Sequence, residues 1–121
     1  MSNRTILLLN AIIELTGGIV LILYPEFLIS GARMDNLEIN LSKMYGIAAT
    51  FIGLFSYILF RFCESDLVIK YSSLAIIVFH LIISFHLYGM LKVSILKEPH
   101  AMITHIAITV LFGFIYLKNV K

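Results

Sequence analysis

Long apolar segments separated by shorter polar ones dominate this chain. Four predominantly hydrophobic stretches run over Thr5–Tyr24, Met44–Phe60, Tyr71–Leu91 and Ala101–Leu117. A bilayer core about 30 Å thick is crossed by about 20 apolar residues in a helix, and somewhat shorter stretches also suffice. The pattern therefore predicts an all-α protein, a transmembrane four-helix bundle forming one integral membrane domain over residues 1–121. No small-residue cleavage site follows the first stretch, so we expect it to be retained as a helix.

Composition agrees with a membrane protein and narrows the function classes. Hydrophobic residues make up 60% of the chain and charged residues 13%, and the mean hydropathy is +1.00. The lipid bilayer is therefore the first expected partner, and a net charge of +2 gives no reason to expect nucleic acid. The single cysteine, Cys63, excludes an internal disulfide. It lies beside Glu64 and Asp66, which disfavour the thiolate, so we interpret it as an inert loop thiol.

The basic residues indicate an orientation in the membrane. One side of the predicted bundle carries five of them, namely Arg4, Arg61, Lys70, Lys118 and Lys121, and the other carries Arg33, Lys43, Lys92 and Lys97. The side with more lysine and arginine faces the cytoplasm. Both termini are therefore expected in the cytoplasm.

The connections between the apolar stretches differ in length and character. The longest, Pro25–Lys43, opens with a proline and carries scattered apolar residues, so we expect it to lie on the membrane surface. Phe62–Lys70 reads as a tight polar turn. In Lys92–His100, Pro99 stands where it can begin the last helix.

A weak internal repeat suggests how the helices are organised. The segment from Ala11 to Tyr24 aligns without a gap to the segment from Ala75 to Tyr88, and the segment 47–50 resembles 106–109. Parallel repeats of this kind occur in membrane folds. The sequence therefore predicts two helical hairpins in parallel duplication.

Small and polar residues form a stripe along each predicted helix. In a bilayer such residues, rather than leucine, mark the contacts between helices, and spacings of three, four and seven place them on one face. We therefore expect the four stripes to face a common interior. Gly46, Ala49 and Gly53 could instead join two copies of the chain, and both alternatives stay open at this point. The stripes are Asn10, Glu14, Gly17 and Gly18; Gly46, Ala49, Thr50, Gly53 and Tyr57; Ser73, His80, Ser84 and Tyr88; and His105, Thr109, Gly113 and Tyr116.

Glu14 is the strongest candidate for function, because it lies midway along the first apolar stretch. A charged carboxylate near the bilayer centre costs about 2.5 kcal/mol or more, so it must be protonated, paired or solvated. His80 lies at nearly the same depth in the third stretch and could bond to it. Such a pair is either a structural contact or a site for a proton or ligand. Asn10, Tyr57 and Ser84 complete the candidate ligand-binding or proton-binding set.

The remaining histidines gather toward one side of the membrane. Imidazole is a common ligand for zinc, copper and haem iron, so His86, His100 and His105 form a candidate metal site. No HExxH, CxxC or CxxCH pattern supports it, and histidines without a ligand remain the alternative. We therefore expect no cofactor, with a haem or metal redox protein as a minor alternative. Hydrolase, P-loop and dinucleotide-binding motifs are also absent from the sequence, which argues against an enzyme.

The segments Tyr24-Pro25 and Leu41-Ser42-Lys43-Met44-Tyr45-Gly46, followed by Gly53-Leu54, resemble the DoxX-like group of small four-helix bacterial membrane proteins. In that group a basic residue shortly before an aromatic residue and a glycine opens the second helix, and Lys43 stands here where arginine is more usual. The resemblance covers the layout of most of the chain. It implies a compact bundle in the bacterial inner membrane, sometimes attached to membrane redox systems, and it supplies no catalytic residues.

A second resemblance concerns the position of Glu14. Small multidrug-resistance transporters also have four helices and a glutamate midway along the first, where it exchanges protons for a cationic drug. They have very short loops and a tryptophan-containing pocket, whereas this chain has no Trp and a long first loop. We interpret the shared glutamate as convergent. The sequence thus predicts a non-enzymatic protein that binds a small lipophilic ligand or a membrane protein partner, and a proton-coupled transporter using Glu14 is the alternative.

Overall fold

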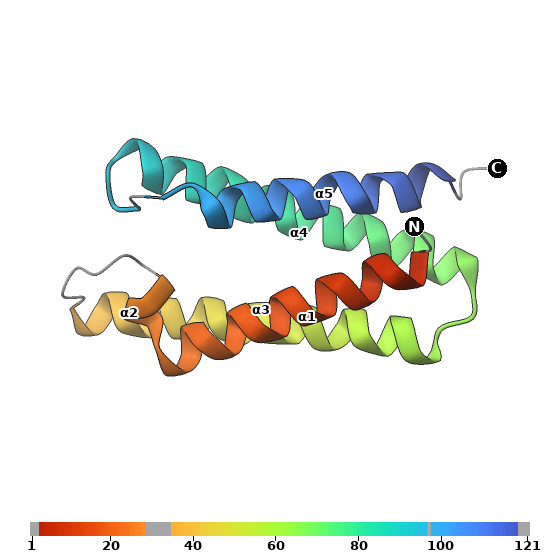
Figure 1. Ribbon diagram of the computed structural model, residues 1–121, viewed down its shortest axis with the longest axis horizontal. Coiled ribbons are helices and arrows are strands. Elements are labelled where there is room, and N and C mark those ends of the chain that lie inside the picture. The colour runs from red at the N-terminus through yellow and green to blue at the C-terminus, as the bar shows by residue number, and fades with distance from the viewer. Residues whose placement is uncertain (1–2, 29–34, 97, 119–121) are drawn as a thin grey trace. The chain divides into compact units, whose positions relative to one another are not determined.

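The computed structural model describes residues 3–28, 35–96 and 98–118, and within them the chain is mostly helical (Figure 1). Four of these helices are long and apolar enough to cross a membrane, so the chain is a small integral membrane protein. The predicted all-α fold with four apolar helices is confirmed. In chain order the helices are α1 (Asn3–Leu23), α2 (Pro25–Leu28), α3 (Asn36–Phe62), α4 (Asp66–Lys92) and α5 (His100–Lys118).

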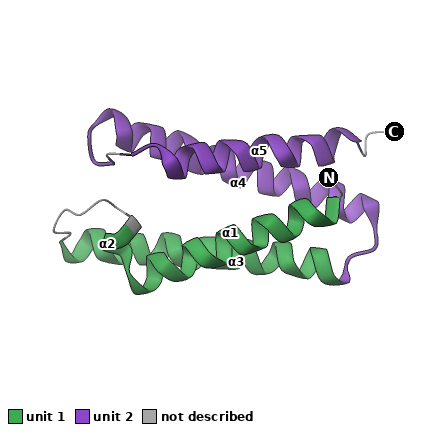
Figure 2. Ribbon diagram, in the orientation of Figure 1, with its two compact units in different colours: residues 1–61 green, residues 62–121 purple. Residues whose placement is uncertain are grey.

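The chain divides into two compact units, 1–61 and 62–121 (Figure 2). The first unit contains α1, α2 and α3, and the second contains α4 and α5. In each unit the two long helices run in opposite directions, so each unit is a helical hairpin. The division falls at the end of α3, which agrees with the two hairpins that the sequence repeat predicts. The origin of the two hairpins by duplication stays a prediction.

The first hairpin packs through glycines that let two backbones approach closely. A Cβ atom added to Gly18 would lie 2.7 Å from the carbonyl oxygen of Gly46, and one added to Gly46 would lie 2.7 Å from the carbonyl oxygen of Gly18. A Cβ on Gly53 would lie 2.7 Å from the backbone nitrogen of Leu15. No side chain fits these distances, which are those of a small-residue helix interface. Of the two alternatives for Gly46 and Gly53, the contact within one chain is therefore realised.

Helix α3 begins earlier than the hydrophobic pattern predicts, at Asn36 instead of Met44. The backbone N–H of Glu38 donates to Asp35 Oδ1, and the N–H of Asp35 donates to Glu38 Oε2, both at 2.8 Å. This reciprocal arrangement is a capping box, which satisfies two backbone donors at the start of a helix. The connection predicted over Pro25–Lys43 is therefore helical in its second half, and its position on the membrane surface stays a prediction. Its residues 29–34 lie outside the described part of the chain.

The other connections follow the sequence more closely. Pro25 occupies the first position of α2, where its missing N–H leaves no bond unmade. The Oγ of Ser65 accepts from the N–H of Val68 at 3.4 Å and caps α4, so the polar turn is shorter than predicted. Pro99 directly precedes α5, and its carbonyl accepts from the N–H of Ile103 at 2.9 Å. The expected start of the last helix is thus confirmed.

The second hairpin packs through side chains. Ile76 of α4 and Phe112 and Ile115 of α5 are almost fully buried. The Nζ of Lys70 lies 5.5 Å from the centre of the Tyr116 ring, which is a cation–π distance and adds a polar link between α4 and α5. Gly113 lies on the predicted stripe of α5, but a Cβ added to it would meet no atom within 4 Å. Glycine therefore marks the helix contact in the first hairpin only.

Candidate functional site

Two imidazoles meet where α4 and α5 pack together. The Nδ1 atoms of His80 and His105 lie 2.7 Å apart, and the two ring centres are 5.0 Å apart with an angle of 38° between the planes. His80 is close to the middle of the 27-residue helix α4 and His105 is in the second turn of α5. The hairpin thus places a direct hydrogen bond between two histidines deep within its membrane-spanning part.

The hydroxyl groups near the imidazole pair are satisfied within their own helices. Ser84 Oγ donates to the carbonyl oxygen of His80 at 2.7 Å, and Thr109 Oγ1 donates to the carbonyl oxygen of His105 at 2.9 Å. The ring of Phe79 meets His80 edge-on, with 5.2 Å between centres. Serine and threonine that bond to the carbonyl four residues earlier do not compete for a partner on another helix. The imidazoles therefore provide the polar contact between α4 and α5 at this level.

The short Nδ1–Nδ1 distance fixes how protons are shared within the pair. A hydrogen bond between two ring nitrogens needs one N–H donor and one bare acceptor, so the two rings cannot hold the same tautomer. In the neutral pair, the ring that donates from Nδ1 has an acceptor at Nε2, and its partner has a donor at Nε2. The two rings exchange their donor and acceptor roles when the proton between the Nδ1 atoms moves to the other ring, one Nε2 gains a proton and the other Nε2 loses one. The pair is therefore able to accept a proton at one ring and release one at the other.

An apolar groove of about 360 Å³ lies along the same hairpin, and its lining includes residues next in sequence to both histidines but neither imidazole. Leu81 and Ser84 follow His80 on α4, and Ile106 follows His105 on α5. Most of the groove wall is hydrocarbon, and the Ser84 hydroxyl is bonded to its own helix. The groove therefore suits a hydrocarbon chain or ring better than a polar solute. Its lining residues are Leu81, Ser84, Phe85, Tyr88, Met102 and Ile106.

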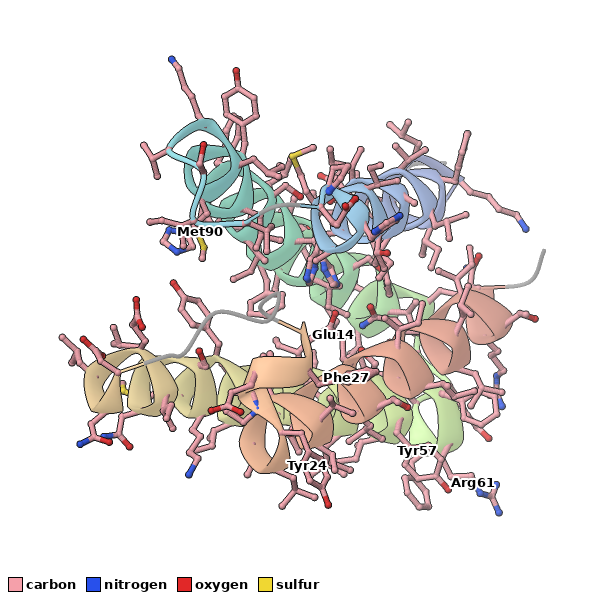
Figure 3. The ribbon with its side chains drawn as sticks, turned by 60° about the vertical axis from the view of Figure 1, so that its left-hand side comes forward. Glu14, Tyr24, Phe27, Tyr57, Arg61 and Met90 are labelled. Atoms are coloured by element: carbon pink, nitrogen blue, oxygen red, sulfur yellow. The ribbon has the colours of Figure 1, made fainter. Side chains whose placement is uncertain are left out.

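Glu14 and Asn10 lie in the first hairpin. Asn10 Nδ2 donates to Ser56 Oγ at 2.8 Å, and both side chains are buried. Glu14 is one helical turn further along α1, also buried, and close to the helix midpoint as predicted (Figure 3). The bond expected between Glu14 and His80 would join the two units, and it stays a prediction.

Tyr57 does not lie on the packed face of α3, contrary to expectation. Its side chain is 41% exposed, and its ring centre is 6.2 Å from that of Phe60. Figure 3 shows Tyr57 near Arg61 toward the end of α3. Successive side chains of a helix point about 100° apart, and the side chain that is buried here is that of the preceding residue, Ser56. The sequence held that signal, because Gly46, Gly53 and Ser56 are seven and three residues apart.

The candidate metal ligands are placed differently from one another. His86 and His100 are exposed, and His100 Nδ1 lies 4.0 Å from Glu98 Oε2. His105 is paired with His80, a contact that the sequence analysis missed although it placed both residues on polar stripes. What it lacked was the register of α5 against α4, which depends on the path of the chain between them. A metal site made by His86, His100 and His105 stays a prediction.

Comparisons with known proteins give no relative on which to base a function. No protein-family model, curated protein or solved structure matches the chain.

Proposed function

We propose that this protein binds a small lipophilic ligand whose head group carries a carbonyl or hydroxyl, as a quinone and its hydroquinone do. The observation that supports the proposal is the His80–His105 hydrogen bond inside a membrane-spanning hairpin that also carries an apolar groove. In this role the protein is a binding module and not an enzyme.

The chemistry of the pair suits such a head group. A carbonyl oxygen needs a donor and a hydroxyl offers one, and the two tautomers of the pair supply a donor or an acceptor in turn. When the group is a carbonyl, the tautomer that offers a donor matches it. When it is reduced to a hydroxyl, the tautomer that offers an acceptor matches it. The hydrocarbon part of the ligand then occupies the groove between Leu81, Phe85 and Ile106.

We also propose that the protein acts in the bacterial inner membrane, with both termini in the cytoplasm, as a DoxX-like protein. The resemblance of Tyr24-Pro25 and Lys43-Met44-Tyr45-Gly46 to that group supports this assignment, and so does the excess of lysine and arginine on the side of the termini. The link of that group to membrane redox systems agrees with a quinone-like ligand.

Binding of a short-chain benzoquinone and of its hydroquinone to the full chain in lipid nanodiscs tests the proposal. We expect His105→Phe to weaken binding of both forms by about tenfold, because it removes a hydrogen bond to the head group or to the ring that holds it. Ile106→Trp, which fills the groove and leaves both imidazoles in place, should weaken binding as strongly. His86→Ala is the matched control, since this exposed histidine lies on the same helix as His80.

The proposal is overturned if His105→Phe and Ile106→Trp, shown by circular dichroism to be folded, both bind the quinone as tightly as the His86→Ala control does. If the wild-type protein binds neither form, the ligand assignment is wrong, and a membrane protein partner becomes the better hypothesis.

Proton-coupled transport is a second candidate, and the observation that favours it is a buried carboxylate at the middle of α1. Intramembrane carboxylates commonly carry protons in transporters. In proteoliposomes with a pH gradient, Glu14→Gln should abolish uptake of a fluorescent lipophilic cation, and Glu64→Gln, in the exposed turn before α4, should not. Equal uptake by the wild type and Glu14→Gln would eliminate proton coupling at this residue.

A further inference from the structure

A second hollow lies in the first hairpin, at the corner where α1 ends. Its volume is about 400 Å³. In contrast to the groove of the second hairpin, it is lined by two residues of opposite charge as well as by aromatic and aliphatic side chains. Figure 3 marks two of the aromatic residues, Tyr24 and Phe27, at this corner. The lining residues are Leu23, Tyr24, Pro25, Glu26, Phe27, Ile39 and Lys43.

The packing of α1 on α3 places this corner at the end of a membrane span. A Cβ added to Gly46 would lie 3.0 Å from the backbone nitrogen of Ile22, in the last turn of α1. Lys43 is three residues before Gly46 and therefore lies beyond that level, where it lines the hollow together with the segment that follows Leu23. Tyrosine and lysine at the end of a span are typical of the head-group region of a bilayer. The hollow is thus at the depth where phospholipid head groups lie.

The two charges of the corner lie on different elements, Glu26 on α2 and Lys43 on α3. No ion pair or hydrogen bond joins these two side chains to each other within the described ranges. The hollow that they both line therefore offers an anion and a cation to one occupant. Tyr24 and Phe27, which are 67% and 81% exposed, add apolar surface beside them.

We propose that this corner, formed by Tyr24, Glu26, Phe27 and Lys43, binds the head group of a zwitterionic phospholipid that carries a primary ammonium group. The lysine ammonium binds the lipid phosphate, and the glutamate carboxylate accepts hydrogen bonds from the lipid ammonium. A primary ammonium donates three hydrogen bonds, as lysine does, whereas a quaternary ammonium donates none. The site therefore prefers phosphatidylethanolamine to phosphatidylcholine. The first acyl carbons lie against the aromatic rings.

Native mass spectrometry of the detergent-purified full chain tests the proposal with phosphatidylethanolamine, phosphatidylcholine and phosphatidylglycerol of the same acyl composition. We expect Lys43→Gln to reduce binding of both zwitterionic lipids by about fivefold, because one cation near the membrane surface is lost. Glu26→Gln should reduce binding of phosphatidylethanolamine only, and so remove the preference over phosphatidylcholine. Lys92→Gln is the control, a lysine at the end of another span that does not line the hollow.

A charge exchange separates specific binding from general attraction to lipid. The double variant Glu26→Lys/Lys43→Glu keeps both charges at the corner, so the preference for phosphatidylethanolamine over phosphatidylcholine that Glu26→Gln removes should return. Free phosphoethanolamine should not compete at the same concentration, because it lacks the acyl chains that pack against the aromatic rings. The proposal is overturned if folded Lys43→Gln and Glu26→Gln bind the three lipids as the wild type does. It is also overturned if Lys92→Gln loses as much binding as Lys43→Gln.

Discussion

The two hairpins of this protein are held together by different means. In the first, the backbones of α1 and α3 approach at Gly18, Gly46 and Gly53, where added Cβ atoms would collide with the facing helix. In the second, neither Gly89 nor Gly113 faces the other helix closely, and α4 and α5 meet through bulky side chains and the His80–His105 bond. The closely packed hairpin has no room for a ligand along its glycine seam. The second hairpin carries an apolar groove along α4 and α5.

This difference shows that a small residue in a membrane helix is not a sufficient sign of contact. Gly17 and Gly18 are neighbours in α1, but only Gly18 faces α3 closely. Gly113 of α5 and Gly89 of α4 have no atom within 4 Å of an added Cβ. Glycine permits close approach of helices, and the facing residue decides whether that approach occurs.

Substitution of the neighbouring glycines is the strongest test of this comparison. Gly18→Ala should destabilise the protein by about 1–3 kcal/mol, because its Cβ would lie within 2.7 Å of backbone atoms of Gly46 and Thr50. Gly17→Ala, in the same helix, should be neutral or stabilise by up to about 1 kcal/mol, because alanine is the better helix former. Reversible unfolding in mixed micelles measures both values.

Equal effects of Gly17→Ala and Gly18→Ala would show that the first hairpin is not packed along the Gly18–Gly46 seam. Gly113→Ala extends the test to the second hairpin. A loss of stability there as large as for Gly18→Ala would contradict the open space found beside Gly113.

Two buried serines provide a smaller test. Ser56 Oγ accepts from Asn10 on the other helix, whereas Ser73 Oγ donates to the carbonyl of Ile69 in its own helix, at 2.7 Å. Ser56→Ala should cost about 0.6–1.7 kcal/mol, the range found for polar contacts between membrane helices. Ser73→Ala should cost much less, since no contact between helices is lost.

A double-mutant cycle of Asn10→Leu and Ser56→Ala identifies the hydrogen bond as the cause. A coupling energy of zero, measured by the same unfolding experiment, would show that the bond between α1 and α3 does not contribute to stability.

The sequence predicted the parts of the fold that depend on hydrophobicity along one helix. The four spans and the central positions of Glu14 and His80 were recognised because each depends on a run of neighbouring residues. The early start of α3 was missed because its first turns are polar. Asp35 and Glu38, three residues apart, are a capping signal for that start, which the hydrophobic pattern alone does not contain.

The site was predictable only in its individual residues. His80 and His105 were both recognised as polar positions, but their pairing depends on the register between two helices, which a single sequence does not state. Tyr57 was predicted to face inward, but the buried residue is its neighbour Ser56. A shift of one position along a helix turns a side chain by about 100°. Contacts within a helix can therefore be predicted from spacing, whereas contacts between helices need the structure.

The capped start of α3 has a consequence for the membrane in which the protein resides. With 27 residues at 1.5 Å each, α3 is about 40 Å long, whereas the hydrocarbon core of a bilayer is about 30 Å thick. The surplus turns carry exposed apolar residues, Leu37 and Leu41, between polar ones. When the bilayer thickens, these turns can enter it, and when it thins they extend into water with the N–H groups of Asp35 and Glu38 already satisfied. The helix is thus suited to membranes of different thickness without a change of fold.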